Sequence, residues 1–167
     1  MSIKNFIRVD HAGEYGAVRI YTGQLAVLGR GKHGDQLRHM KDQELHHLDT
    51  FAKLIAERHG RPTALLPLWH VAGFALGAIT AAIGPEAAMA CTVAVEETID
   101  AHYAAQRDRL GDDEKPLRDT IEEFRLEEVE HRDIGLQNGA ERAPAYRVLH
   151  KLISLGCKAA IGISEII

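Results

Sequence analysis

The sequence predicts an all-α protein built as a helical bundle. Strand signals are few, apolar residues recur with helical spacing, and the five prolines stand at the ends of these periodic stretches. The 167 residues suit a single domain covering 1–167, and a hydrophobic content of 46% supplies one core. The expected fold is therefore a set of helices joined by short connections around one core.

Glycines, prolines and helix caps divide the chain into six expected helices. Asp35 is the expected N-cap of the second helix and Gly60 its stop, while Pro85 and Pro116 stand in the first turns of the fourth and fifth. The expected helices cover about 3–28, 35–59, 65–83, 85–110, 114–138 and 145–167.

The third and last of these helices are unusually apolar. Segment 63–85 contains no charged residue and is about long enough to cross a bilayer. Gly73 and Gly77 form a small-xxx-small pair that allows close helix contact. Three interpretations stay open: a helix lying in the membrane surface, which we favour, a core or oligomer-interface helix, and a full span. The last helix, 145–167, could extend the same apolar surface.

Charge and cysteine content argue against several classes of function. A net charge of -4 at pH 7 gives no electrostatic support for a nucleic-acid partner. Cys91 and Cys157 are too few for a disulfide framework or a zinc ribbon, and we interpret them as small buried hydrophobes. Residues 1–10 lack the features of a signal peptide. A reducing compartment, in the cytosol or at a membrane surface, is consistent with these features.

Two helices each carry a Glu-x-x-His motif. Glu44 precedes His47 in the second helix, and Glu128 precedes His131 in the fifth. Residues three apart share one face of a helix, so each pair can offer a carboxylate oxygen and an imidazole nitrogen to one metal ion. In di-iron carboxylate bundles two helices supply such motifs, and two others supply one glutamate each.

Two lone glutamates complete the pattern. Glu14 lies on the apolar stripe of the first helix and Glu96 on that of the fourth, where a carboxylate is costly unless it is paired or binds a metal. Glu14 precedes Glu44 by 30 residues and Glu96 precedes Glu128 by 32, so the chain resembles two copies of one hairpin. Surface helices with ordinary ion pairs would not explain these core-facing positions. A carboxylate-rich set with one imidazole per metal and no thiolate favours iron or manganese.

Four segments give the chain a specific resemblance. They are Arg8–Ala17 (RVDHAGEYGA), Cys91–Glu97 (CTVAVEE), Glu128–Gly135 (EVEHRDIG), and Pro67–Trp69 followed by Gly73–Gly77. The chain closely resembles the demethoxyubiquinone hydroxylase family over nearly its whole length. The resemblance implies a ferritin-like four-helix bundle with a di-iron centre plus two additional apolar helices. It also implies a monooxygenase that hydroxylates the ring of a demethoxy-ubiquinone or ubiquinol in ubiquinone biosynthesis.

The resemblance assigns roles to individual residues. Glu14, Glu44 and His47 would serve one iron, and Glu96, Glu128 and His131 the other, with Glu44 and Glu128 bridging both. His102 and Tyr103 match a family position near the substrate and the electron path, although ordinary helix packing would also account for them.

The resemblance also implies cofactors and partners. We expect two iron ions per chain, dioxygen as co-substrate, NADH as electron donor and a polyprenyl quinone as substrate. Further expected partners are the membrane surface, a lipid-binding or other ubiquinone-biosynthesis protein and a second copy of the chain. The expected location is peripheral, on the cytoplasmic side of the cell membrane, or on the matrix side of the mitochondrial inner membrane in a eukaryote. A charge at Leu76 is expected to reduce membrane binding. The competing function is ferritin-like or rubrerythrin-like iron oxidation or peroxide removal.

Overall fold

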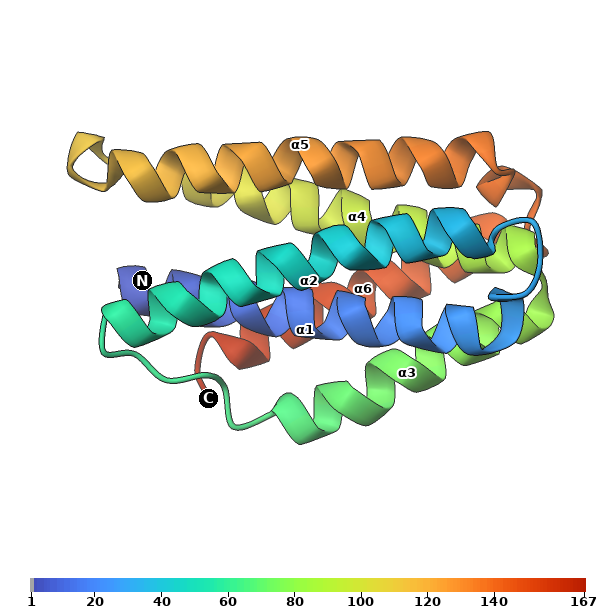
Figure 1. The fold of residues 1–167 in the computed structure, drawn as a ribbon, viewed down its shortest axis with the longest axis horizontal. Helices are drawn as coiled ribbons and strands as arrows, with labels where there is room; N and C mark the ends of the chain where they lie inside the picture. Colours follow the sequence, from blue (N-terminus) through green and yellow to red (C-terminus); the bar gives the residue numbers. More distant parts are fainter. Residues whose placement is uncertain (1) are drawn as a thin grey trace.

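Two helical hairpins form the centre of the fold, described for residues 2–167 of a computed structural model. The first hairpin pairs α1 (Ile3–Leu28) with α2 (Gly34–Glu57), and the second pairs α4 (Pro85–Arg107) with α5 (Lys115–Gln137) (Figure 1). The short 3-10 turn η1 (Asp112–Glu114) connects α4 to α5. This arrangement confirms the all-α bundle and the two-hairpin organisation predicted from the sequence.

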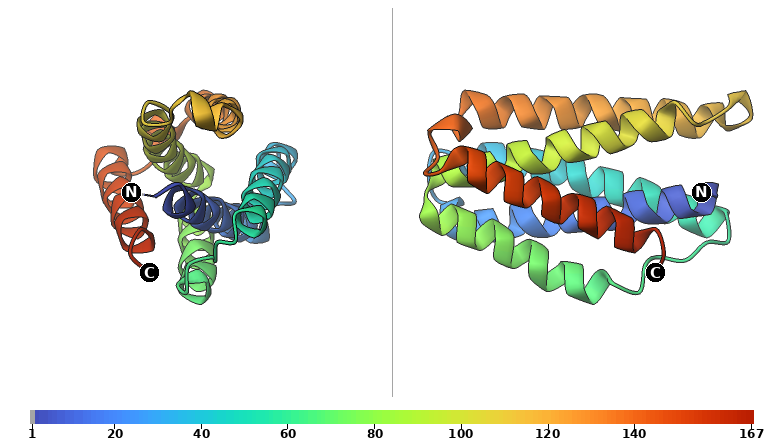
Figure 2. Two further views of the ribbon diagram at one scale, coloured as in Figure 1. Left: turned by 90° about the vertical axis from the view of Figure 1, so that its left-hand side faces the viewer. Right: turned by 180° about the vertical axis from the view of Figure 1, so that it is seen from behind.

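The two apolar helices lie outside the four-helix centre. Helix α3 (Leu66–Ile83) connects the hairpins and packs on α1, whereas α6 (Tyr146–Ser164) follows the turn η2 (Ala140–Arg142) and packs mainly on α4. Figure 2 shows α3 and α6 on neighbouring sides of the bundle, away from α2 and α5. Within residues 2–167 the backbones of α3 and α6 do not come close to each other, and a slot lined by side chains of both helices lies between them.

Some helix ends differ from the sequence prediction. Helix α2 begins at Gly34, and Asp35 lies in its first turn, where its Oδ1 accepts a hydrogen bond from Arg38 at 2.6 Å instead of capping the helix. At the other end His59 takes the left-handed conformation, with φ of 52°, and the Gly60 N–H donates to the Ile55 carbonyl at 2.8 Å. Helices α4 and α6 also end three residues earlier than expected, in tighter turns at Arg107 and Ser164.

Glycines bring α3 unusually close to α1. A Cβ atom on Gly77 would lie 2.0 Å from the Ile20 carbonyl oxygen, and one on Gly23 would lie 2.2 Å from the Phe74 carbonyl oxygen. The small-xxx-small pair therefore serves a contact within the chain. The outer face of α3 stays exposed, with Val71 at 66% and Ile79 at 61%, so the interpretation of α3 as a core helix is wrong.

Substituting Gly77 by alanine is expected to lower the free energy of unfolding by about 1–3 kcal/mol, the usual cost of overpacking. The added Cβ meets backbone of α1 rather than a movable side chain, so the two helices must separate. Gly162→Ala is the matched control, because its Cβ meets nothing within 4 Å and alanine favours a helix by roughly 0.5–1 kcal/mol. Chemical denaturation measures both variants, and equal stability of Gly77→Ala and wild type would contradict the close-contact argument.

Candidate functional site

The six predicted metal ligands converge at the centre of the four-helix bundle. Each of α1 and α4 contributes one glutamate and each of α2 and α5 a Glu-x-x-His pair, and all six side chains are at most 1% exposed. Their ligand atoms form two groups, each spanning no more than 4.8 Å. One group is Glu14, Glu44, His47 and Glu128, and the other is Glu44, Glu96, Glu128 and His131.

Glu44 and Glu128 belong to both groups and lie between the two histidines. The Oε1 atom of Glu44 is 3.1 Å from His131 Nδ1, and its Oε2 atom is 3.8 Å from His47 Nδ1. The Oε1 atom of Glu128 is 3.2 Å from His47 Nδ1, and its Oε2 atom is 3.5 Å from His131 Nδ1. Each of these carboxylates is therefore placed where it could bridge two metal ions.

Burial sets the proton affinity of the two lone glutamates. Burial and then the neighbouring charge of Glu44 raise the pKa of Glu14 well above its ordinary value. Burial and then the charge of Glu128 do the same for the pKa of Glu96. Burial therefore disfavours the charged form of both carboxyl groups unless a cation compensates the charge.

The histidines carry the compensating charge. Burial alone would lower the pKa of His47, but the carboxylates of Glu128 and Glu14 raise it to about 12. Burial also opposes protonation of His131, whose pKa is raised to about 11 by Glu128 and Glu44. Protons thus occupy the cluster where divalent cations would bind, so metal binding must displace them.

Many polar atoms of this cluster have no hydrogen-bond partner within residues 2–167. Buried polar atoms are almost always paired, and leaving one unpaired costs roughly 1–3 kcal/mol. The atoms without a hydrogen bond are Glu14 Oε2, both oxygens of Glu44, His47 Nδ1, Glu96 Oε2, both oxygens of Glu128 and His131 Nδ1, although both Nδ1 atoms lie within ion-pair distance of carboxylate oxygens. Because all of them belong to residues of the two groups, the donor set is suited to a pair of divalent metal ions.

Two tyrosines cross between the hairpins to the lone glutamates. The Tyr21 hydroxyl donates to Glu96 Oε1 at 2.6 Å, and the Tyr103 hydroxyl donates to Glu14 Oε1. Each tyrosine follows the lone glutamate of its own helix by seven residues. The family resemblance points to Tyr103 but not to Tyr21, whose matched spacing from Glu14 is the signal in the sequence that could have identified it.

His102 lies outside the two groups of predicted metal ligands. Its Nε2 atom is 3.2 Å from Asp10 Oδ1, to which the Gln106 amide also donates at 2.7 Å. Asp10 is buried, and burial raises the pKa of its carboxyl group although contact with His102 opposes the shift. Asp10 and Gln106 were not predicted as site residues, although Asp10 lies in the segment Arg8–Ala17 that carries the family resemblance.

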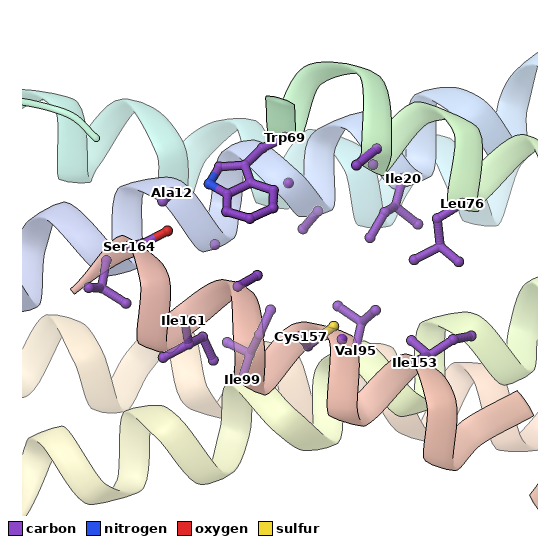
Figure 3. A pocket seen from close by; sticks show the side chains of 18 of the residues that line it. Ala12, Ile20, Trp69, Leu76, Val95, Ile99, Ile153, Cys157, Ile161 and Ser164 are labelled. Carbon is purple, nitrogen blue, oxygen red and sulfur yellow. The ribbon is translucent and has the colours of Figure 1, made fainter. Parts of the chain in front are cut away.

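An apolar cavity of about 490 Å³ lies on the other side of α1 and α4, bounded also by α3 and α6. Figure 3 shows Trp69 and Leu76 pointing into it from α3, opposite Ile153 and Ile161 of α6. Small residues on α1, including Gly16, leave its wall open. Helices α1 and α4 supply ligands on one side and cavity wall on the other, so they alone separate the cavity from the ligand cluster.

Comparison with known proteins agrees with this arrangement. Residues 1–164 match the family described as ubiquinone biosynthesis protein COQ7. A relative from Rhodospirillum rubrum, named 3-demethoxyubiquinol 3-hydroxylase, is 64% identical over 164 residues, which cover 98% of this chain and 77% of the relative. The Homo sapiens protein named NADPH-dependent 3-demethoxyubiquinone 3-hydroxylase, mitochondrial, is 54% identical over 168 residues, with 98% and 77% covered. The Saccharomyces cerevisiae 5-demethoxyubiquinone hydroxylase, mitochondrial, is 43% identical over 176 residues, with 95% and 76% covered. The chain belongs to the COQ7 family of ubiquinone biosynthesis proteins.

Proposed function

We propose that this protein is a di-iron monooxygenase that hydroxylates the ring of a demethoxy-ubiquinone or ubiquinol. The observation that carries the proposal is the cluster of buried carboxylate and imidazole atoms that lack hydrogen bonds, beside a large apolar cavity. The names of the relatives support hydroxylation over the ferritin-like alternative. An apolar cavity is suited to an organic substrate, whereas iron oxidation or storage does not need one.

Glu14, Glu44, His47, Glu96, Glu128 and His131 are the proposed ligands of two iron ions. When bound, two irons would activate dioxygen and pass electrons to it. The protein's part is to hold Glu44 and Glu128 between the two positions and to keep both imidazole Nδ1 atoms facing inward. Tyr21 and Tyr103 orient the lone glutamates through their hydrogen bonds, and the surrounding bundle excludes water.

The apolar cavity is the proposed binding site of the quinone. Its lining is almost entirely hydrocarbon, which is suited to a polyprenyl tail and an apolar ring. The cavity reaches the α1 and α4 backbones that carry Glu14 and Glu96, so a ring at its inner wall would lie next to the metal centre. The slot between α3 and α6 would let the tail extend outward.

The overall reaction consumes one dioxygen, two electrons and two protons. One oxygen atom replaces a ring hydrogen as a hydroxyl group, and the other leaves as water. A nicotinamide cofactor is the proposed electron donor. The family resemblance predicts NADH, whereas the name of the human relative specifies NADPH. We place His102, held by Asp10, and Tyr103, held by Glu14, on the path for the substrate or electrons.

A peripheral position on the membrane is proposed for the outer faces of α3 and α6. Helix α3 is long and apolar enough to cross a bilayer, but it packs on α1 along one side and exposes the other. The exposed apolar side chains on these two helices include Leu68, Val71, Ile79, Ile83, Val148, Leu152, Leu155 and Ile163. A face of this kind lies in the membrane interface with the cavity opening toward lipid. A second copy of the chain and a lipid-binding protein stay predicted partners, as does the cytoplasmic or matrix side.

Charges on the outer face of α3 are expected to weaken membrane binding at least about tenfold, because burying a large apolar side chain contributes roughly 1.5–3 kcal/mol. Leu76 is unsuitable for this test, since it faces the cavity and the core rather than the outside. The double variant Val71→Glu/Ile79→Glu changes outward-facing positions instead. Leu126→Glu/Leu136→Glu on the distant helix α5 is the matched control.

Sedimentation with phosphatidylethanolamine–phosphatidylglycerol vesicles would measure the bound fraction of each protein. Loss in the α3 variant alone, with metal content unchanged, is the expected result. Equal binding by the α3 variant and wild type would mean that another surface contacts lipid.

Isotope labelling tests the reaction itself. Iron-loaded protein, a nicotinamide reductant and a demethoxy-quinone analogue would be incubated under ¹⁸O₂, and the quinone analysed by mass spectrometry. We expect one labelled oxygen in a new ring hydroxyl group. Oxidation of Fe²⁺ with the label only in water or peroxide, and no ring product, would instead favour iron oxidation or peroxide removal.

A further inference from the structure

Gln43 and Glu127 occupy equivalent places in the two hairpins. Each immediately precedes the glutamate of a Glu-x-x-His motif, and each reaches across to the histidine of the other motif. Glu127 Oε2 on α5 is 2.7 Å from His47 Nε2 on α2, and Gln43 Oε1 on α2 is 3.0 Å from His131 Nε2 on α5. Both helices thus hold the outer nitrogen of the histidine that the other helix presents to the cluster.

These contacts determine which imidazole nitrogen faces the cluster. A glutamate or amide oxygen accepts from an Nε2–H, which leaves Nδ1 as the inward-facing nitrogen of each ring. His47 Nδ1 lies 3.2 Å from Glu128 Oε1, and His131 Nδ1 lies 3.1 Å from Glu44 Oε1. The ring of Phe124 stacks on His47 with centroids 3.9 Å apart and further restrains its orientation.

The paired positions around the cluster are otherwise chemically alike. The matching pairs are Glu14 with Glu96, Tyr21 with Tyr103, Glu44 with Glu128, and His47 with His131. The Glu127–Gln43 pair differs in charge, because one acceptor is a carboxylate and the other a neutral amide. A charge-assisted hydrogen bond is shorter and stronger, and it makes the opposite ring nitrogen a better electron donor. The shorter contact to Glu127 agrees with this difference.

We propose that Glu127 and Gln43 are positioning residues that make the two metal positions unequal. The position served by Glu14 and His47 binds its metal more tightly, because Glu127 increases the basicity of His47. The position served by Glu96 and His131 binds more weakly, because Gln43 orients His131 without adding charge. The first metal ion therefore binds at the His47 position. When metal is removed, the ion at the His131 position dissociates first. This proposal rests on the metal centre proposed above.

Titration of the metal-free full-length chain with Co²⁺, followed by calorimetry and visible absorption, tests the inequality. Wild type is expected to bind in two steps with different absorption spectra. Glu127→Gln should weaken the tighter step by about 10- to 100-fold, the usual cost of changing such an outer contact, so that the two steps merge. Gln43→Glu should strengthen the weaker step. The double exchange Glu127→Gln/Gln43→Glu should restore two steps in the opposite order.

The order of loading is assigned with variants that remove one position at a time. Glu14→Gln removes a ligand of the His47 position, and Glu96→Gln removes one of the His131 position. Glu130→Gln is the charge-matched control, since Glu130 is exposed on the same helix, and it should leave both steps unchanged.

Three outcomes would overturn the inference. Unchanged steps in Glu127→Gln and Gln43→Glu would show that the outer contacts do not set affinity. An equal effect of Glu130→Gln would show that Glu127 affects metal affinity only through its negative charge and not through its contact with His47. Absence of Co²⁺ binding in wild type would overturn the metal centre itself, which distinguishes that failure from the other two.

Discussion

Replacing Glu96 by glutamine is expected to abolish metal binding at the His131 position while leaving the metal-free fold intact. Burial and then the charge of Glu128 raise the pKa of Glu96 well above its ordinary value, so the metal-free fold favours the neutral form of this carboxyl group. Glutamine mimics that neutral form, and its amide oxygen can still accept from Tyr21. The variant therefore loses an anionic ligand without losing a structural contact.

Without metal, the free energies of unfolding of wild type and Glu96→Gln should depend differently on pH. In the unfolded chain Glu96 ionises around its ordinary pKa of 4.5, whereas in the folded metal-free chain it ionises at a higher pH. Folding therefore takes up a proton, and the free energy of unfolding of wild type decreases as pH rises above that value. Glu96→Gln lacks this loss and should be at least as stable as wild type at pH 7.

Adding metal should make wild type more stable to unfolding than Glu96→Gln. A divalent ion at about 100 times its Kd stabilises a folded chain by about 2.7 kcal/mol per site, and the variant should lose this contribution at one site. Thermal unfolding with and without Co²⁺ measures the difference. Glu97→Gln is the matched control, because Glu97 is exposed and contacts His150 at the surface. Full metal stabilisation of Glu96→Gln would show that Glu96 is not a ligand.

Filling the cavity with a leucine at Gly16 is expected to block the quinone while preserving the fold. A Cβ at Gly16 meets nothing within 4 Å, and the residue lines the cavity on α1. Leucine also favours a helix over glycine by roughly 0.8–1 kcal/mol, so the variant should fold at least as well as wild type. The added side chain occupies space proposed for the ring or the first part of its tail. Turnover of a polyprenyl substrate should fall by about 10- to 200-fold, the effect of one misplaced methylene in a fitted pocket, or by more.

A control substitution must show that the loss of turnover depends on the position of the added leucine. Gly162→Leu makes the same change on α6, where a Cβ also meets nothing within 4 Å and no cavity is lined. We expect it to keep wild-type turnover, and we expect both variants to keep their metal content. Wild-type turnover by Gly16→Leu would show that the quinone reaches the metal centre by another route.

The sequence predicted the elements and the ligands because both depend on local periodicity. Residues three apart share a helix face, so Glu44 with His47 and Glu128 with His131 could be paired without coordinates. The helix ends were less predictable. The end of α2 depends on His59 entering the left-handed region, a conformation that no sequence rule would assign to that residue before Gly60.

Contacts between helices could not be predicted in the same way. Tyr21 reaches Glu96 across 75 positions of the chain, and Glu127 reaches His47 across 80, so their pairing depends on how the hairpins cross. The cavity likewise depends on the slot between α3 and α6, and it turned Leu76 from an expected membrane-facing residue into a wall residue.

By itself the sequence determined an all-α bundle, the six candidate metal ligands and the resemblance to a hydroxylase family, because these follow from spacing along single helices and from short motifs. Only the tertiary structure decided that Gln43 and Glu127 hold the outer imidazole nitrogens, and that α1 and α4 separate the predicted ligands from an apolar cavity. The physical reason is that helix packing sets the distances between side chains on different helices. Periodicity along each helix sets only the direction in which those side chains point.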